Sequence, residues 1–199
     1  MTVAKTRNSD SLAFLFDLDG TLIDSVYQHV LAWREATQAA GIELPVWRIQ
    51  RVHAEAYAKQ APSLRVLPGA QELLDTLADH RVPHAIATSG RMHSARHALK
   101  LLKLHQNVPI ITRDDIRFAK PDPDLFVAAG KRLKVSMSRC VIVGDSVWDL
   151  LAARRAFALS VGLLSGGYGR EELERAGAYR VYQDPADVLR HLDEVGVRL

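Results

Sequence analysis

The chain has a single cysteine and no long apolar run, and these two absences exclude several classes of protein. Cys140, inside the apolar segment CVIVG, has no partner for a disulfide within the chain, so we expect a packed core thiol in a reducing compartment. No segment approaches the ~18 apolar residues that a membrane span requires. The polar opening MTVAKTRNSD also lacks the apolar centre of a secretion signal. The sequence therefore predicts a cytoplasmic protein with no membrane partner.

The sequence also lacks a strong excess of charge. Its formal net charge is +3, and its 26 lysines and arginines are scattered along the chain, so we expect no nucleic-acid partner. Internal repeats and low-complexity stretches are missing as well. With 199 residues, 48% of them hydrophobic, the chain can bury a full core and is expected to form one domain with a small insertion.

Short apolar runs alternate regularly with helical patterns. This alternation predicts an α/β fold of three layers, in which a parallel sheet carries helices on both faces. The predicted strands span residues 12–16, 84–88, 108–112, 140–144 and 160–164. The predicted helices of this core span residues 70–80, 94–102, 123–133, 146–156, 170–176 and 185–195.

One segment interrupts the alternation. Between the first strand and Pro68-Gly69, two helical patterns at 26–40 and 45–59 follow each other with no strand between them. We expect a helical insertion above the sheet, with Asp24 and Ser25 as caps of its first helix. The predicted boundaries are an α/β core at 11–24 and 66–199, a reduced helical cap at 25–65 and a flexible tail at 1–10.

Acidic residues follow two of the predicted strands. Asp17 and Asp19 end the first strand, and because they are two apart both can lean to the same side. Asp145 ends the fourth strand, with Asp149 one turn into the next helix. Ligands of parallel sheets bind at the carboxyl ends of the strands, so these acids are expected to converge. Crowded carboxylates favour a hard divalent cation, and the sequence predicts Mg²⁺ as cofactor.

Residues suited to a phosphate group follow the other strands. Thr88 and Ser89 end the second strand and supply hydroxyls and backbone N–H groups, and Lys120 supplies a compact positive charge. Acids, a metal and phosphate donors together imply phosphoryl transfer, with Asp17 attacking phosphorus and Asp19 handling the proton of the leaving group. The predicted phosphate-binding residues are Thr88, Ser89, Gly90, Arg91 and Lys120.

Four motifs in this order resemble those of the haloacid dehalogenase-like superfamily. They are DLDGT at Asp17–Thr21, the strand that ends in Thr88, the lysine of AKPDP at Lys120, and GDSVWD at Gly144–Asp149. The segment AGAYRVYQDPADVL further resembles the closing segment of phosphoglycolate phosphatase-like and beta-phosphoglucomutase-like members. The resemblance covers nearly the whole chain and implies a Rossmann-like core.

The resemblance also implies a role for each matching residue. Asp17 would be the nucleophile and a magnesium ligand, and Asp19 the general acid and base that binds the metal through its backbone carbonyl. Thr88 would hydrogen-bond the phosphoryl oxygens, and Lys120 would pair with the nucleophile and the phosphate. Asp145 would ligate the metal directly, and Asp149 would hold it through water or orient its neighbours. A dehalogenase needs neither Asp19 nor a metal, so Asp19 favours a phosphatase.

The helical insertion is shorter than in family members that carry a cap after the first motif. The missing part lies near Trp47–Arg51, where the junction WRIQRV resembles the scar of a deletion. A cap excludes water and contacts the leaving group, so a reduced cap is expected to weaken selectivity while leaving the phosphoryl site intact. A mutase, which must shield its intermediate, would suffer more. Exposed apolar surface on the cap would favour self-association or a partner.

Several of these residues also have a plain structural interpretation. Asp145 or Asp149 could cap the helix that begins at Ser146, and Lys120 could be a solvated lysine, but the coincidence of all the strand ends favours a site. His93 and His97 lie four apart with no third ligand nearby, so we expect a solvated helix face. For Arg91, and for His29 and Arg34 on the first cap helix, substrate contact and a surface role both stay open.

Two further features are expected to be structural. The segment GLLSGGYG at 162–169 lacks the spacing of a phosphate-binding glycine loop and is interpreted as a flexible connection between a strand and a helix. Trp148 is expected to pack on the sheet, and Trp33 within the first cap helix.

The sequence thus predicts a magnesium-dependent phosphatase. Its substrate would be a small phosphorylated metabolite resembling phosphoglycolate or a sugar phosphate, hydrolysed through an aspartyl phosphate on Asp17. A sugar phosphomutase is the second hypothesis. The third is a non-catalytic interaction protein built on a phosphatase scaffold that has lost part of its cap.

Overall fold

The centre of the molecule is a parallel β-sheet. A computed structural model of the chain describes residues 12–40 and 55–197. In these residues, six parallel strands are arranged in the order β5-β4-β1-β6-β7-β8. The strands are β1 (Ala13–Phe16), β4 (His84–Ala87), β5 (Ile110–Ile111), β6 (Cys140–Gly144), β7 (Leu159–Leu163) and β8 (Arg180–Tyr182).

Helices cover both faces of this sheet. Their bounds are α3 (Ala70–Asp79), α4 (Met92–Leu101), α5 (Asp124–Leu133), α6 (Val147–Arg155), α7 (Arg170–Ala176) and α8 (Pro185–Arg190). Short 3₁₀ turns complete the core: η3 (Arg113–Asp115), η4 (Met137–Arg139), η5 (Leu164–Gly166) and η6 (Leu192–Val195). The predicted fold, a three-layer Rossmann-like α/β architecture, is confirmed.

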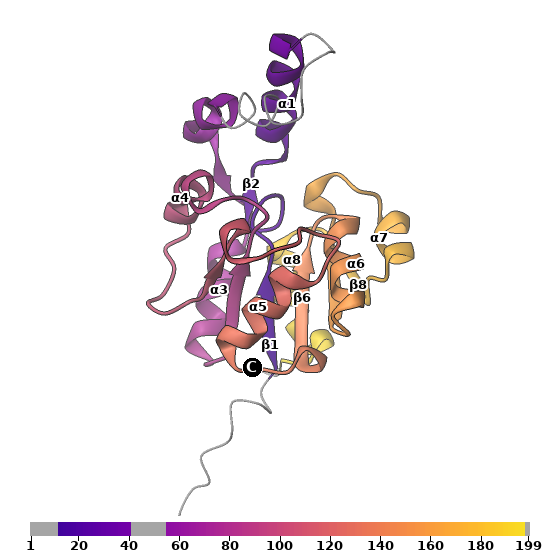
Figure 1. The fold of residues 1–199 in the computed structure, drawn as a ribbon. Helices are drawn as coiled ribbons and strands as arrows, with labels where there is room; N and C mark the ends of the chain where they lie inside the picture. Colours follow the sequence, from indigo (N-terminus) through magenta and orange to yellow (C-terminus); the bar gives the residue numbers. More distant parts are fainter. Residues whose placement is uncertain (1–11, 41–54, 198–199) are drawn as a thin grey trace, which may run out of the picture.

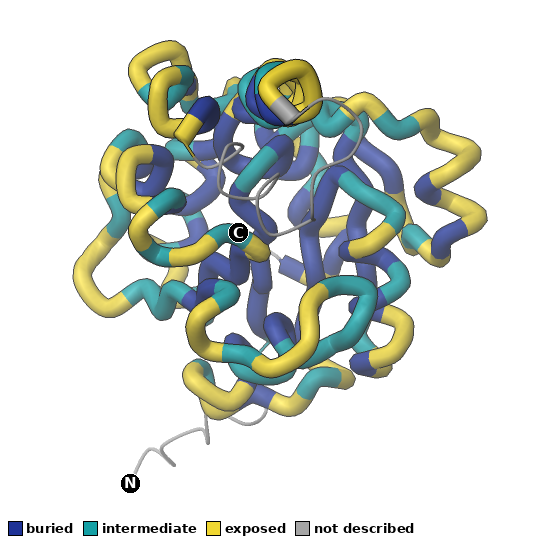
Figure 2. Tube along the Cα trace, turned by 45° about the horizontal axis from the view of Figure 1, so that its top comes forward, coloured by how far each residue is buried: buried dark blue, intermediate teal, exposed yellow. Residues whose placement is uncertain are grey.

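Alternation along the strands divides the core into two parts, one on each face. Phe14 and Phe16 of β1 belong to the cluster formed with α3, α4 and α8, whereas Ala13 and Leu15 belong to the cluster formed with α5 and α6. Strand side chains alternate between faces, so strands that are apolar at every position must be covered on both sides. Figure 2 shows the strands as a buried centre surrounded by helices with exposed outer faces.

The insertion leaves and rejoins the core through a second, two-stranded sheet. β2 (Ile23–Asp24) pairs antiparallel with β3 (Arg65–Val66), so the two ends of the insertion lie side by side. Between them lie α1 (Val26–Ala40), helical residues 55–60 and the turn η2 (Ala61–Ser63). α1 extends beyond the carboxyl ends of the parallel strands (Figure 1).

The predicted elements agree with the structure best in the core. The strand at 140–144 is found as predicted, the strands near 14, 86 and 161 differ by a residue at one or both ends, and the strand predicted at 108–112 is limited to Ile110–Ile111. The short strands β2, β3 and β8 were not predicted. The helix predicted at 26–40 is α1, whereas most of the helix at 45–59 and the tail at 1–10 lie outside the described residues.

Cys140 lies in the core as predicted, and burial raises the pKa of its thiol to about 11. The helices of residues 12–40 and 55–197 include none with the length and apolar character needed to cross a membrane.

Candidate active site

The carboxyl ends of the three central strands bring polar residues together. Asp17 follows β1, Thr88 follows β4 and Asp145 follows β6, so residues from distant parts of the chain share one edge of the sheet. Ser146 occupies the position before the first residue of α6 and starts that helix beside Asp145. The site therefore rests on rigid strand ends, which is typical of ligand sites in parallel sheets.

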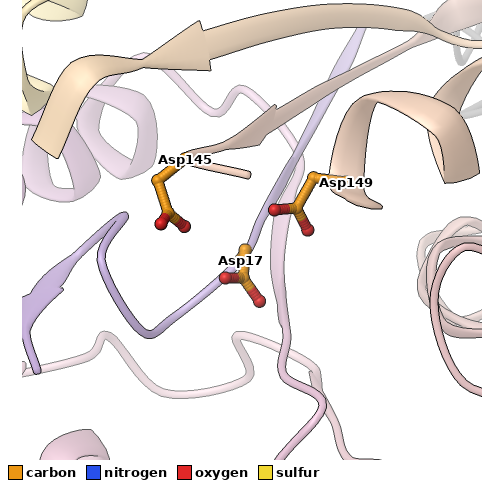
Figure 3. A group of neighbouring side chains, drawn as sticks. All are labelled: Asp17, Asp145 and Asp149. Atoms are coloured by element: carbon orange, nitrogen blue, oxygen red, sulfur yellow. The ribbon is translucent and has the colours of Figure 1, made fainter. Parts of the chain in front are cut away.

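Three buried carboxylates form the centre of the site. Each of Asp17, Asp145 and Asp149 places one oxygen within 4.8 Å of an oxygen of the other two. Figure 3 shows their carboxylates around a shared space. In the part of the chain that the structure describes, these three side chains are the group of potential metal ligands that lie close enough together to share one ion. The side chain of Asp19, predicted with them, is not part of the group; the resemblance assigned Asp19 to the metal through its backbone carbonyl.

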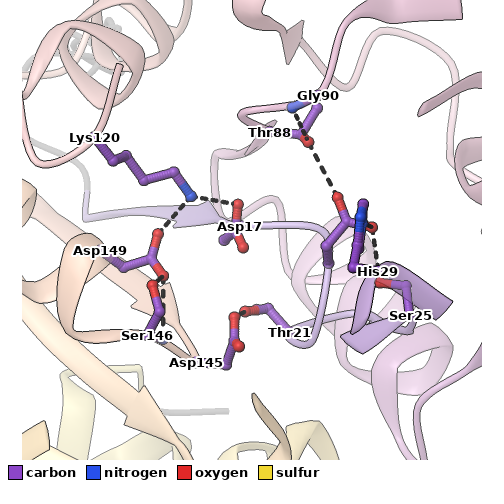
Figure 4. Close-up of polar contacts among 11 residues, drawn as sticks. Asp17, Thr21, Ser25, His29, Thr88, Gly90, Lys120, Asp145, Ser146 and Asp149 are labelled. Carbon is purple, nitrogen blue, oxygen red and sulfur yellow. Dashed lines mark hydrogen bonds and ion pairs between the residues drawn. The ribbon is translucent and has the colours of Figure 1, made fainter. Parts of the chain in front are cut away.

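Lys120 joins two of these carboxylates. Its ammonium nitrogen lies 2.6 Å from Oδ1 of Asp17 and 2.6 Å from Oδ1 of Asp149 (Figure 4). The lysine side chain is only 8% exposed, and burial alone would lower its pKa, but the charges of Asp149 and Asp17 outweigh burial and raise that pKa. Three negative charges face one positive charge, so the group keeps two negative charges in excess.

Burial and mutual repulsion raise the pKa values of two of these acids. Burial raises the pKa of Asp17 well above its usual range; Lys120 opposes this, and Asp149, Asp145 and Asp19 add to it. Burial, followed by the charge of Asp149, raises the pKa of Asp145 to about 7. A buried carboxylate is unfavourable when nothing neutralises it, so the group is suited to a cation.

Close backbone contacts hold Asp145. Its Oδ1 accepts a hydrogen bond of 3.0 Å from the Thr21 hydroxyl. A Cβ atom on Gly20 would lie 2.4 Å from its Oδ2, and one on Gly166 would lie 1.8 Å from the same oxygen, so only glycine fits at either position. Gly20 also has a positive φ of 78°, which glycine adopts without strain. The Ser165 hydroxyl, 2.6 Å from the carbonyl of Gly20, joins η5 to the first motif.

Asp149 caps α6 with one carboxylate oxygen and contacts Lys120 with the other. Its Oδ2 accepts hydrogen bonds from the backbone N–H and the hydroxyl of Ser146, at 3.2 and 2.6 Å, which forms a capping box at the start of α6. Its Oδ1 faces Lys120. The helix cap therefore orients the carboxylate toward the site.

Asp19 lies in a different environment from Asp17. Its Oδ1 accepts hydrogen bonds from the Ser25 hydroxyl at 2.7 Å and the Tyr57 hydroxyl at 3.3 Å, and lies 3.4 Å from Nε2 of His29. Burial raises the pKa of Asp19, but the hydrogen bond and charge of His29 and the bonds from Ser25 and Tyr57 outweigh it, so the net pKa is lowered. The imidazole of His29 stacks on the ring of Tyr57 with centroids 4.1 Å apart.

Ser25, His29 and Tyr57 come from the insertion or its edge. Ser25 precedes α1, as predicted for a cap, but its hydroxyl donates to Asp19; Asp24 belongs to β2. His29 is on α1 and Tyr57 lies in the helical residues 55–60. The sequence left the role of His29 open, and the structure places its Nε2 3.4 Å from Oδ1 of Asp19.

Thr88 bridges Asp19 and the loop after β4. Its buried hydroxyl lies 3.4 Å from Oδ2 of Asp19 and accepts a 3.0 Å hydrogen bond from the backbone N–H of Gly90. Its own N–H bonds to the carbonyl of Ile111 in the sheet. The N–H groups of Thr88 and Gly90 are therefore engaged within the protein in this structure. Ser89 is exposed.

Two arginines that the sequence analysis considered for substrate contact are exposed. Arg91 is exposed, and its guanidinium lies 2.7 Å from Oδ1 of Asp114. Oδ2 of the same carboxylate accepts a hydrogen bond from the N–H of Met92 at the start of α4. This pair links the start of α4 to Asp114. A contact of Arg91 with phosphate stays a prediction. Arg34 is exposed on α1.

A cavity of about 340 Å³ opens beside Lys120. The residues that line it are Ser89, Lys120, Pro121, Ser146 and Trp148. Trp148 was expected to pack on the sheet, and this expectation is wrong, since the side chain is 50% exposed at the wall of the cavity. Trp33 is also 44% exposed, whereas burial within α1 was expected. In both helices the buried positions belong to smaller or neighbouring residues, such as Ala32 and Leu150.

Sequence reasoning missed several supporting residues of the site. Thr21 and Ser146 stand inside quoted motifs, and the spacing of Ser146 and Asp149 is that of a capping box, which was a usable signal. The segment 162–169 was interpreted as a flexible connection, but Ser165 and Gly166 within it support Gly20 and Asp145. His93 and His97 are exposed on α4, as expected. Tyr57 carried no signal in the sequence.

Comparisons with known proteins agree with this fold. Residues 46–156 match the family model described as haloacid dehalogenase-like hydrolase, a span that includes Thr88, Lys120, Asp145 and Asp149. A solved hydrolase from Pseudomonas syringae is 45% identical, with a TM-score of 0.89 over 94% of this chain and 100% of that chain.

Two curated relatives are phosphatases. Validoxylamine A 7'-phosphate phosphatase of Streptomyces hygroscopicus subsp. limoneus is 31% identical over 75% of this chain and 84% of its own length. Hexitol phosphatase A of Escherichia coli is 29% identical over 72% of this chain and 78% of its own length. The chain therefore belongs to the haloacid dehalogenase-like hydrolases, and these relatives place it among the phosphoric monoester hydrolases of that family.

The alignment with the Streptomyces phosphatase also bears on length. It runs over 178 positions but uses only 75% of the 199 residues of this chain, so the relative has residues that this chain lacks. The reduced insertion stays a prediction.

Proposed function

We propose that the chain hydrolyses small phosphate monoesters of the sugar-phosphate type in a magnesium-dependent reaction that passes through an aspartyl phosphate on Asp17. The observation that carries this proposal is the contrast between two acids of one motif. Asp17 faces Lys120 within a group of three carboxylates, while Asp19 is held apart by Ser25, Tyr57 and His29. One acid is thus arranged as a nucleophile and the other as an acid and base. The phosphorylated substrates in the names of the two curated relatives support the substrate class.

The residues of the site fit a magnesium ion. All three side chains of the group offer oxygen donors, and the two negative charges in excess match a divalent cation. Asp17 and Asp145 would hold the ion, with Asp149 bound through water and the backbone carbonyl of Asp19 as a further donor. When bound, the ion supplies positive charge that neutralises Asp17 and the phosphoryl oxygens.

Asp17 acts as the nucleophile in the first half of the reaction. One of its carboxylate oxygens forms a bond to phosphorus while the bond between phosphorus and the ester oxygen breaks, and Asp19 gives a proton to the departing oxygen. Lys120 and the Thr88 hydroxyl bind the phosphoryl oxygens. In the second half, a water molecule gives a proton to Asp19 and its oxygen forms a bond to phosphorus. The bond between phosphorus and Asp17 breaks, so phosphate is released and the Asp17 carboxylate is regenerated.

The environment of Asp19 suits both halves of the reaction. Its lowered pKa keeps the carboxylate ionised in the free enzyme, ready to accept a proton. An incoming phosphate dianion acts in the opposite direction, because a nearby like charge raises the pKa of a carboxyl group. Substrate binding therefore favours the protonated form that the first half needs.

Hydrolysis of p-nitrophenyl phosphate by the purified chain tests the proposal, with Asp17→Asn as the variant. We expect turnover that requires Mg²⁺ and stops with EDTA, and a loss of at least about a thousandfold in the variant. Mass spectrometry after rapid acid quenching should find a phosphoryl adduct on the peptide that contains Asp17. Circular dichroism checks that both proteins are folded.

A folded wild-type chain that is no more active than Asp17→Asn would overturn the proposal. Activity without an adduct on Asp17, retained in the variant, would leave a phosphatase but reject the covalent mechanism.

A further inference from the structure

Trp148 is an exposed aromatic residue in the first turn of α6, at the edge of the candidate active site. It is the second residue of α6, directly before Asp149, and the indole is 50% exposed although Asp149 and Leu150 after it are fully buried. Leaving so large an apolar side chain half in water forgoes the free energy of burying it. An indole in this position is available to a ligand.

The cavity that Trp148 lines combines two chemical kinds of residue. Ser89, Lys120 and Ser146 are polar or charged residues, whereas Trp148 and Pro121 carry largely apolar rings. Its volume of about 340 Å³ is at the small end of the range for small-molecule sites, which begins at roughly 300 Å³. A phosphate ester has the same two parts, an anionic group and a less polar organic group.

Exposure alone does not distinguish Trp148. Phe157 at the other end of α6 is 86% exposed, and Phe118 is 51% exposed beside Arg117, but neither lines this cavity. Trp148 combines an exposed aromatic face with a cavity that also contains Lys120, which contacts the nucleophile at 2.6 Å.

We propose that Trp148, with Pro121 beside it, binds the organic part of the substrate, and that this part is a ring: the ring of a phosphorylated sugar or cyclic polyol. The inference rests on the proposed function and refines it. The flat face of an indole covers one face of a ring and contacts its C–H groups, whereas an acyclic chain covers less of the indole and loses more rotational freedom when it is ordered there. With a reduced insertion above the site, this wall on the core supplies selectivity.

Steady-state kinetics with two kinds of ester test the inference. Trp148→Ala is expected to raise KM for fructose 1-phosphate or glucose 6-phosphate about tenfold, because it removes an aromatic contact made by bound substrate and transition state alike. KM for the acyclic ester glycerol 3-phosphate, and kcat for both kinds, should change less than about twofold. Trp148→Phe should restore most of the affinity for the ring esters. Phe157→Ala, which removes an exposed aromatic side chain just after the end of the same helix, is the matched control and should change neither constant.

Binding can also be followed without turnover. Titration of Asp17→Asn protein with a ring sugar phosphate should give a saturable change in tryptophan fluorescence. The same titration of Asp17→Asn with Trp148→Phe should lose that change, although Trp33 and Trp47 remain.

The outcomes separate this inference from the function on which it rests. An active wild type whose KM rises equally for ring and acyclic esters in Trp148→Ala, or rises for neither, would overturn the role of Trp148 and leave the phosphatase intact. A folded wild type that hydrolyses no ester would overturn both.

Discussion

Asp17 and Asp19 are two residues apart, yet the protein treats them in opposite ways. Asp17 belongs to the core half of the site: its partners are Lys120 and the acids around α6, and burial raises its pKa. Asp19 belongs to the insertion half, where donors from α1 and residues 55–60 lower its pKa despite burial. The difference shows that one short loop can carry two kinds of carboxylate when different parts of the chain surround it.

The acids of the core half of the site follow a strand or lie in the first turn of a helix. Asp145 is fixed by Thr21 and by glycine backbone, and Asp149 by the capping box of α6. The insertion half depends on where α1 and residues 55–60 lie. Changes in the core half should therefore affect metal binding and stability, and changes in the insertion half should affect proton transfer.

The largest effect is expected from Lys120→Met in the core half. It leaves three buried carboxylates without their cation, so kcat should fall about a hundredfold or more, and the free energy of unfolding in EDTA at pH 7.5 should fall by about 3 kcal/mol. The pKa values of Asp17 and Asp145, already raised, should rise further. Folded protein then binds more protons than unfolded protein as pH falls, so the loss of stability should be smaller at pH 5.5.

Urea denaturation at the two pH values measures this loss, and kinetics with p-nitrophenyl phosphate measures kcat. Lys131→Met, on the exposed side of α5, is the control. If Lys120→Met is as stable as wild type at pH 7.5, the three acids do not depend on the lysine for their burial.

An intermediate effect is expected from Gly166→Ala, also in the core half. The added Cβ would lie 1.8 Å from Oδ2 of Asp145, so the carboxylate must move, and about tenfold more Mg²⁺ should be needed for half-maximal activity. Gly167→Ala is a matched control, because the added Cβ would meet nothing within 4 Å. Its φ of 89° is nevertheless strained for alanine. That variant should lose about 1 kcal/mol of stability with no change in Mg²⁺ requirement.

Mg²⁺ titrations of activity and of the thermal unfolding midpoint compare the two glycine variants. Equal Mg²⁺ requirements in both would mean that the contact of η5 with Asp145 does not hold the metal site.

The smallest effect is expected in the insertion half, from His29→Ala. Removing the imidazole 3.4 Å from Asp19 should lower kcat by about fivefold and raise the pKa of Asp19. The ionised form of Asp19, needed to activate water, then forms only at higher pH, so the acid limb of the pH–rate profile should move to higher pH. Mg²⁺ requirement should stay unchanged.

A pH–rate profile of wild type and His29→Ala, at saturating Mg²⁺, measures the shift. Tyr57→Phe, which removes only the hydroxyl 3.3 Å from the same carboxylate, should move the limb in the same direction by less. If the acid limb stays in place in both variants, ionisation of Asp19 does not set the pH dependence of the rate.

The core half could be predicted from sequence because its residues are tied to local patterns. Apolar runs locate the strands, the polar residue after each run marks the common edge, and parallel pairing then brings Asp17, Thr88 and Asp145 together. β8 was missed because its three residues carry too short a pattern, and β2 and β3 because two residues each form no run at all.

The insertion half could not be predicted in the same way. The contacts of Tyr57 and His29 with Asp19 depend on how α1 and residues 55–60 pack, and periodicity does not specify packing between helices. Trp148 was misplaced for a related reason: aromatic residues usually pack in the core, but the buried face of α6 at this point is occupied by Asp149 and Leu150.

The small antiparallel pair of β2 and β3 has a consequence for how such enzymes diversify. Ile23 lies opposite Val66 and Asp24 opposite Arg65, so the chain returns to the core beside the point where it left. A segment whose ends already meet can be lengthened or shortened at little cost in loop entropy and without moving the strands on either side. The β2–β3 pair is therefore a suitable junction for exchanging the insertion. Insertions of different lengths from related enzymes could be joined at these four residues to change which substrates the enzyme accepts.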